Sequence, residues 1–172
     1  TKRIEIRISG LGGQGVVLAG DILGRAAVYD GKNAVQTQSY GAEARGTAAK
    51  SEVIVSGGKI GFPMVRKCDI LVAMSQSAVD KYLKNLKGKR TLVIDEDMVQ
   101  NAETLLGSGL YANIVILGAL TKITGLVKQE AVEKAIIDSV PETARETNIK
   151  AFKEGLKLIC LDDLRAYQSR HH

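Results

Sequence analysis

The sequence feature that most constrains the fold is a glycine-rich loop between a predicted strand and a predicted helix. Residues 4–8 alternate apolar and polar side chains, which is typical of a β-strand. Residues 10–15 then read Gly-Leu-Gly-Gly-Gln-Gly, and residues 16–28 repeat apolar side chains at helical spacing. A tight turn from a strand into a helix brings backbone N–H groups to the positive end of the helix dipole. The pattern therefore predicts a strand-loop-helix unit that binds an anion.

The glycine loop differs from a dinucleotide-binding fingerprint at the strand that follows it. The first, second and third glycines of the G-x-G-x-x-G spacing permit the turn, the approach of a phosphate and the packing of the helix on the strand. Residues 35–39, however, hold neither an acidic residue for the ribose of NAD nor an arginine for the phosphate of NADP. We interpret the loop as a site for a phosphate or a carboxylate; the alternative is a loop that serves only close packing. The candidate ligand-binding residues are Gly10, Gly12, Gly13, Gln14 and Gly15, and the amide of Gln14 is expected to contact a ligand or another subunit directly.

The remainder of the chain alternates further strands and helices. Strands are predicted at residues 33–38, 51–56, 69–74 and 91–94, and helices at residues 78–86, 111–124, 129–139 and 143–161. This alternation is typical of a Rossmann-like α/β fold, with a largely parallel sheet flanked by helices. Residues 1–172 contain no repeat, low-complexity segment or linker, so we expect a single domain.

The composition argues against several classes of protein. The net charge is 24 − 19 = +5, and the seven aromatic residues are scattered without a dense basic stripe, so no nucleic-acid interface is expected. No apolar run approaches the ~18 residues of a transmembrane helix, and no signal peptide is visible. Two cysteines without motif spacing favour a reducing compartment, so a cytoplasmic protein is expected. Cys68 and Cys160 lack metal-ligand spacing, and the only histidines are His171 and His172. We therefore expect no metal site, two buried thiols, and no complete catalytic constellation.

A second polar cluster, residues 36–47, follows the second predicted strand. If the two strands are parallel, both clusters lie at the edge where α/β sheets bind ligands. Arg45 would then bind an anion or a partner carboxylate, whereas the alternative is a solvated surface pair between Glu43 and Arg45. The candidate interface residues of this cluster are Gln38, Tyr40, Glu43 and Gly46.

Together the two clusters resemble the gamma subunit of 2-oxoacid:ferredoxin (acceptor) oxidoreductases. The resemblance rests on residues 10–17 (GLGGQGVV) and 37–46 (TQSYGAEARG), with further likeness at residues 72–76 and 112–119, and it runs over nearly the whole chain. The TQSYG run is most similar to the 2-oxoglutarate branch. Two positions depart from the family pattern, Ala42 in place of proline and Thr47 in place of glycine, and residues 95–110 form a shorter segment than the family pattern has.

The resemblance implies a Rossmann-like subunit that is not catalytic alone. It implies a heterotetramer with alpha, beta and delta subunits, which decarboxylates 2-oxoglutarate in a step of the TCA cycle, forms an acyl-CoA and reduces ferredoxin or a similar acceptor. Thiamine diphosphate, magnesium and iron–sulfur clusters are then expected in the partner subunits. This chain would bind no cofactor firmly, but would help to hold coenzyme A through the glycine loop and Arg45 and close the active site. Without its partners it is expected to self-associate.

Three other functions stay open at the level of sequence. A freestanding dinucleotide-dependent oxidoreductase would bind NAD or FAD tightly by itself. An interaction module would use its glycine loops for packing alone. The small subunit of an indolepyruvate oxidoreductase would share the chemistry but act on a different substrate.

Overall fold

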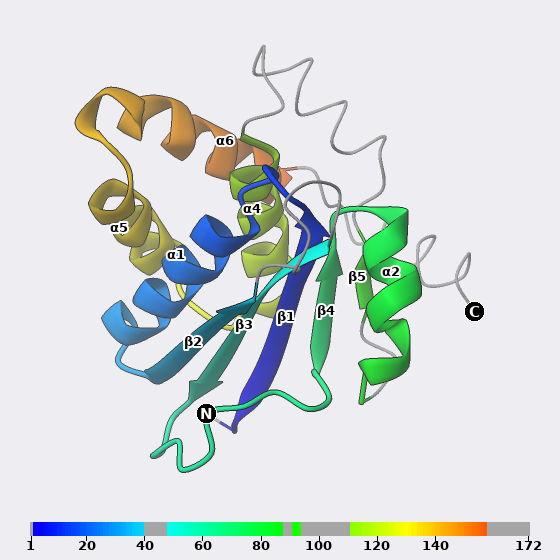
Figure 1. Cartoon of the computed structure of the whole chain (residues 1–172). Helices are drawn as coiled ribbons and strands as arrows, with labels where there is room; N and C mark the ends of the chain where they lie inside the picture. The colour runs from blue at the N-terminus through cyan, green and yellow to red at the C-terminus, as the bar shows by residue number, and fades with distance from the viewer. Residues whose placement is uncertain (1, 40–47, 88–90, 94–110, 158–172) are drawn as a thin grey trace.

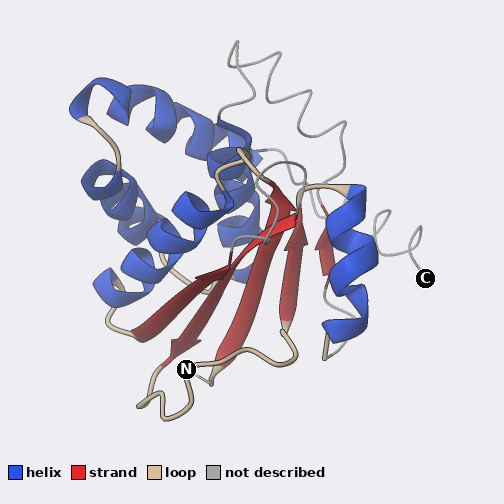
Figure 2. Ribbon diagram, viewed as in Figure 1, coloured by secondary structure: helices blue, strands red, loops and turns tan. Residues whose placement is uncertain are grey.

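The fold is built around one sheet with helices on both of its faces (Figures 1 and 2). The structure is a computed structural model that describes residues 2–39, 48–87, 91–93 and 111–157. Its strands are β1 (Ile4–Leu11), β2 (Asn33–Ser39), β3 (Ala48–Ser56), β4 (Ile70–Ala73) and β5 (Thr91–Val93). Its helices are α1 (Val16–Tyr29), α2 (Gln76–Tyr82), α4 (Ala112–Thr124), α5 (Gln129–Ser139) and α6 (Arg145–Lys157), with short 3-10 turns at η1 (Leu83–Asn85) and η3 (Glu142–Ala144).

The strand order is β2-β3-β1-β4-β5, with one strand reversed. Strand β4 pairs in parallel with both β1 and β5, whereas β3 runs antiparallel to both β1 and β2. The predicted α/β fold is confirmed, and four of the five strands point the same way, but β3 separates β2 from β1. The physical reason is the length of the connection: only residues 40–47 join β2 to β3, and parallel neighbours need a crossover of about a dozen residues or more.

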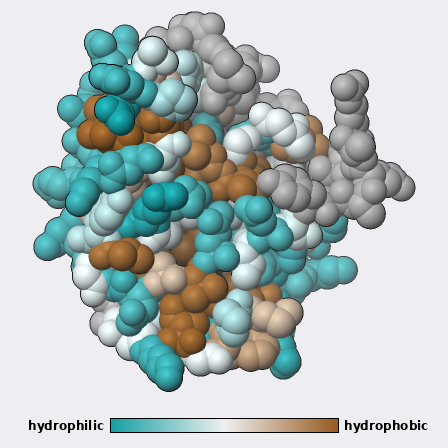
Figure 3. Space-filling view, turned by 60° about the vertical axis from the view of Figure 1, so that its left-hand side comes forward, coloured by the Kyte–Doolittle hydropathy of each residue, from teal (hydrophilic) through white to brown (hydrophobic). Residues whose placement is uncertain are grey.

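The first face of the sheet carries the main apolar core, under α1, α4, α5 and α6. Ile6 and Ile8 of β1 point into this core and are fully buried, as the alternation of residues 4–8 predicts. Fully burying one such side chain stabilises the fold by about 1.5–3 kcal/mol. Figure 3 shows this side of the molecule from outside, with apolar areas lying among hydrophilic side chains.

Helices α4 and α6 touch backbone to backbone, through Gly118 and Gly155. A Cβ atom added at Gly155 would lie 2.0 Å from the carbonyl oxygen of Val115, and one at Gly118 would lie 2.3 Å from that of Phe152. Neither backbone oxygen can move without shifting its helix. These glycines therefore set the separation of the two helices.

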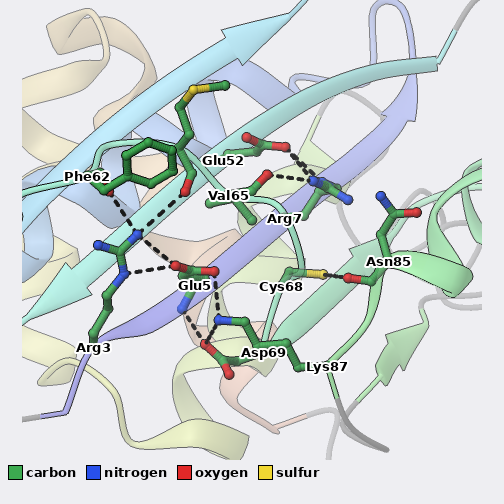
Figure 4. A network of polar contacts seen from close by, with 11 residues as sticks. Arg3, Glu5, Arg7, Glu52, Phe62, Val65, Cys68, Asp69, Asn85 and Lys87 are labelled. Atoms are coloured by element: carbon green, nitrogen blue, oxygen red, sulfur yellow. Dashed lines mark hydrogen bonds and ion pairs between the residues drawn. The ribbon is translucent and has the colours of Figure 1, made fainter.

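The second face of the sheet buries charged side chains next to a smaller apolar cluster (Figure 4). Arg7 of β1 is only 2% exposed, and its Nε donates a hydrogen bond to Oε1 of Glu52 at 2.9 Å. Its Nη2 donates to the carbonyl oxygen of Val65 at 3.2 Å, and its guanidinium carbon lies 5.1 Å from the centre of the Tyr82 ring. Arg7 thus joins the sheet, the segment before β4 and helix α2.

Glu5, two residues earlier on β1, is the centre of a second cluster of charges. Its carboxylate accepts hydrogen bonds from Nε of Arg3 at 2.8 Å and from Nζ of Lys87 at 2.7 Å. Its backbone N–H donates to Oδ2 of Asp69 at 2.8 Å. Burial alone would raise the pKa of Glu5, but the hydrogen bonds from Lys87 and Arg3 outweigh it and hold this pKa below its ordinary value.

The contact between α4 and α6 can be tested with two alanine substitutions. Gly155→Ala is expected to lower the free energy of unfolding by about 1–3 kcal/mol, because the new methyl group overlaps a backbone carbonyl. Gly24→Ala, within α1, is the matched control: its Cβ would meet nothing within 4 Å, so the better helix propensity of alanine should raise stability by up to about 1 kcal/mol. Urea unfolding followed by circular dichroism measures both, and equal effects would contradict the close contact.

The charges around Glu5 predict a pH-dependent stability. Because the folded pKa of Glu5 is lowered, its contribution is complete above the ordinary glutamate pKa and is lost as the pH falls through the lowered value. Glu5→Gln should therefore cost about 1–2 kcal/mol at pH 7, with the difference from wild type shrinking below about pH 4. Urea unfolding between pH 3 and pH 7 tests this, with the exposed Glu142→Gln as control. A difference that persists unchanged at pH 3 would contradict the assignment.

Candidate functional site

The candidate site lies where β1 and β4 end, at a switch point of the sheet. Strand β1 leads through the glycine loop into α1, which packs on the first face. Its parallel neighbour β4 leads into α2, which packs on the second face. Open α/β sheets bind ligands in the crevice at the carboxyl end of two strands whose helices go to opposite faces. The topology therefore places the predicted loop at the favoured position.

The glycine loop presents an uncapped helix N-terminus. Gly13 and Gly15 have φ angles of 89° and 71°, which residues other than glycine rarely adopt. Gly15 is the N-cap of α1 and makes no side-chain capping hydrogen bond. A Cβ atom at Gly12 or Gly13 would meet nothing within 4 Å, so this part of the loop faces open space. The loop can therefore offer free backbone N–H groups to an anion.

Gln14 ties the loop to the end of β4. Its Oε1 accepts a hydrogen bond from the backbone N–H of Leu11 at 2.6 Å, and its Nε2 donates to the carbonyl oxygen of Met74 at 3.4 Å. Gly10 leaves room for this arrangement, because a Cβ there would lie 2.5 Å from Oε1. The sequence interpretation gave the amide of Gln14 a direct contact with a ligand or subunit. In the structure both ends of this amide bind the chain's own backbone, and its contact with a ligand or another subunit stays a prediction.

Asn113 of α4 is a site residue that the sequence reasoning missed. It is 3% exposed, and its Nδ2 donates a hydrogen bond to the carbonyl oxygen of Gly15 at 3.2 Å. A Cβ at Gly15 would lie 2.4 Å from this nitrogen, so Gly15 is required for space as well as for its φ angle. Within the described chain, Oδ1 of Asn113 is buried without a hydrogen-bond partner. The sequence signal that could have identified it is that Asn113 places a polar amide within the apolar run at residues 112–119.

Two serines after β4 add hydroxyl groups to the same edge. Oγ of Ser75 accepts a hydrogen bond from the backbone N–H of Ala78 at 3.3 Å, which caps α2. It also lies 3.1 Å from Oγ of Ser77. Residues 72–76 added to the family resemblance, but no sequence pattern indicated that Ser75 lies beside the glycine loop. The parallel pairing of β1 with β4 brings the two strand ends together.

The second predicted cluster begins and ends at this edge. Gln38 lies near the end of β2 and is exposed. Leu11 pairs with Ala48, so β3 begins beside the end of β1, whereas Ser39 pairs with Lys50 and lies one strand further away at the same edge of the sheet. The remaining candidates of this cluster, which are Tyr40, Glu43, Arg45 and Gly46, lie outside the described residues, as do Ala42, Thr47 and the short segment 95–110.

Two further features of the described part of the chain bear on its function. No group of three or more His, Cys, Asp or Glu side chains in it could hold a metal ion. No helix in it is long and apolar enough to cross a bilayer. Cys68 is fully buried, as predicted, and burial raises the pKa of its thiol, whereas Cys160 lies outside the described residues.

Comparison with known proteins identifies relatives over most of the chain. The family model "Pyruvate ferredoxin/flavodoxin oxidoreductase" matches residues 5–158. The 2-oxoglutarate synthase subunit KorC of Methanocaldococcus jannaschii is 49% identical over 175 residues, which cover 91% of this chain and 94% of that protein.

Solved structures have the same fold. The crystal structure of a keto/oxoacid ferredoxin oxidoreductase gamma subunit from Geobacter sulfurreducens matches with a TM-score of 0.81 and 44% identity, over 91% of this chain and 96% of that one. A 2-oxoglutarate:ferredoxin oxidoreductase from Magnetococcus marinus, solved with 2-oxoglutarate, coenzyme A and succinyl-CoA bound, also has a TM-score of 0.81, over 92% of this chain and 31% of that one. At 22% identity this second match shows the fold alone. The chain therefore belongs to the pyruvate ferredoxin/flavodoxin oxidoreductase family, as its resemblance to the gamma subunits predicted.

Proposed function

We propose that this chain is the gamma subunit of a 2-oxoglutarate:ferredoxin oxidoreductase, which converts 2-oxoglutarate and coenzyme A to succinyl-CoA and CO₂. The observation that carries the proposal is the 49% identity to a 2-oxoglutarate synthase subunit along nearly its whole length. This likeness favours the gamma subunit over a freestanding dinucleotide-dependent enzyme, a packing module or an indolepyruvate oxidoreductase subunit.

The proposed complex contains alpha, beta and delta subunits together with this chain, as a cytoplasmic heterotetramer. Thiamine diphosphate, magnesium and the iron–sulfur clusters belong to those partners in this proposal. The two cysteines of this chain, 92 residues apart in sequence, do not have the spacing of a cluster motif. Ferredoxin or a similar acceptor receives the electrons. An isolated gamma subunit would associate with itself through surfaces that its partners normally cover.

The role we propose for this chain is to hold a phosphate group of coenzyme A at the end of β1. The described loop fits a phosphate in two respects: Gly12 and Gly13 face open space, and α1 begins without a side-chain cap. The hydroxyl groups of Ser75 and Ser77 lie at the neighbouring strand end and can donate further hydrogen bonds. Arg45, in the segment that adjoins this edge, would add a positive charge. Coenzyme A itself supplies the thiol that accepts the acyl group.

The complex is tested by anaerobic affinity purification of this chain from its native host, followed by mass spectrometry. Thiamine- and cluster-binding subunits should accompany the chain in fixed stoichiometry. The purified complex should reduce an acceptor only when both 2-oxoglutarate and coenzyme A are present. A chain that emerges alone would contradict the proposal, and its glycine loop would then be tested for NAD or FAD binding.

The phosphate role is tested by Gly12→Ala in the assembled complex. Gly12 does not have a positive φ, and the added methyl group meets no atom of this chain, so stability should change by less than about 0.5 kcal/mol. The methyl group would displace a bound phosphate, so the KM for coenzyme A should rise about tenfold, a loss of about 1.4 kcal/mol in binding. The KM for 2-oxoglutarate should stay unchanged.

Gly58→Ala is the matched control for this test. It also adds a methyl group in open space, but after β3, at the opposite edge of the sheet. Arg45→Ala should likewise raise the KM for coenzyme A or weaken subunit assembly. If the Gly12→Ala and Arg45→Ala complexes both assembled like wild type and both kept the wild-type KM for coenzyme A, the proposed site would be contradicted.

A further inference from the structure

Segment 57–67, between β3 and β4, presents two large apolar side chains on a basic surface. Phe62 is 46% exposed and Met64 is 59% exposed. The segment lies at the edge of the sheet where β1 begins, opposite the glycine loop, because Ile4 pairs with Val55 and Ile6 with Ile70. We refer to Phe62, Met64 and the exposed cations Lys59, Arg66 and Lys67 as the Phe62 surface.

The backbone of the Phe62 surface is held in place from below (Figure 4). Nη2 of Arg3 donates hydrogen bonds to the carbonyl oxygens of Phe62 at 2.8 Å and Met64 at 3.4 Å. Nε of the same arginine is bound to Glu5, and the next carbonyl, that of Val65, accepts from the buried Arg7. The two apolar side chains are therefore presented by an ordered backbone. Because the backbone is already ordered, binding a partner here would cost less conformational entropy.

The charge of this surface has one sign. Residues 57–67 contain two lysines and one arginine but no acidic residue. The guanidinium carbon of Arg66 lies 5.3 Å from the centre of the Phe62 ring, so a cation flanks the exposed aromatic side chain. The nearby carboxylate of Glu5 is buried and bound by Arg3 and Lys87, so it does not neutralise the surface. Negative charge on a partner would complement this surface.

We propose that the Phe62 surface docks on another subunit of the oxidoreductase, at an acidic patch around an apolar pocket that receives Phe62 and Met64. The partner's identity as a subunit rests on the proposed function; its chemistry rests on the surface itself. An aromatic side chain with arginine beside it is the composition of interface hot spots, and complementary charge accelerates docking. Two protruding side chains on a fixed backbone suit a shaped pocket better than a lipid surface, which needs a continuous apolar face.

The test is the affinity of the purified chain for the remaining subunits, prepared together without it and measured anaerobically by biolayer interferometry. Phe62→Ala/Met64→Ala should weaken binding at least about tenfold, whereas thermal unfolding should stay as in wild type. Arg66→Glu/Lys67→Glu should also weaken binding and should reduce the dependence of affinity on salt between 50 and 300 mM NaCl. The matched control is Val28→Ala on α1, an apolar side chain that is 55% exposed on the other side of the sheet and should leave the affinity unchanged.

Distinct outcomes separate failure of the docking surface from failure of the proposed function. Wild-type affinity in both double variants would overturn the docking surface and leave the subunit assignment intact. A wild-type chain that does not bind the remaining subunits would overturn the assignment, and the inference with it. Light scattering could show that the wild-type chain is a dimer and that Phe62→Ala/Met64→Ala is a monomer which still binds the other subunits. That result would show that a second copy of the chain occupies the surface. If the double variants lost binding to anionic vesicles but kept their affinity for the other subunits, the surface would be a membrane contact. Either the dimer result or the vesicle result would overturn the proposal.

Discussion

The two-sided packing of strand β1 is the constraint on which the rest of the structure depends. Ile6 and Ile8 extend into the apolar core, whereas Glu5 and Arg7 extend into a layer of buried charges on the opposite face. Both faces of one strand are thereby committed, one by the hydrophobic effect and the other by ion pairs and hydrogen bonds between buried groups. The ends of β1 are fixed as a result: its carboxyl end carries the glycine loop, and the charges near its amino end hold segment 57–67 in place.

The glycine loop shows how the same strand supports function. Its conformation is determined by contacts with two separate segments and by one backbone angle: Gln14 binds Met74 after β4, Asn113 of α4 binds the carbonyl oxygen of Gly15, and Gly15 itself adopts a positive φ. None of these contacts uses the N–H groups of Gly12 or Gly13. A loop that is held at its flanks and left free at its centre suits the phosphate that we propose it binds, because its N–H groups would need no rearrangement when the ligand arrives.

Local patterns allowed much of this to be predicted from the sequence. The predicted helix at residues 129–139 matches α5, and that at 16–28 falls one residue short of α1, because both have regular apolar spacing. The predicted strand at residues 51–56 began three residues after the start of β3 at Ala48, because glycines and polar residues precede β3 in the sequence. The prediction also missed that β3 runs antiparallel to its neighbours. The glycine loop was found because all of its residues are consecutive. Asn113 and Ser75 were missed because only the fold brings them to the loop, from about 100 and 60 residues further along the chain.

The buried ion pair also helps to set the register between β1 and β3. Arg7 and Glu52 are directly paired across β1 and β3, and each is less than one-tenth exposed. A slip of one residue between these strands would turn Glu52 toward the apolar core and leave Arg7 without its partner, at a cost of about 3–5 kcal/mol. The same slip would turn Val53 and Val55 out of the apolar core, so the apolar face opposes it as well. The two faces together fix the register, and the register places Leu11 opposite Ala48, so β3 begins beside the strand end that carries the glycine loop.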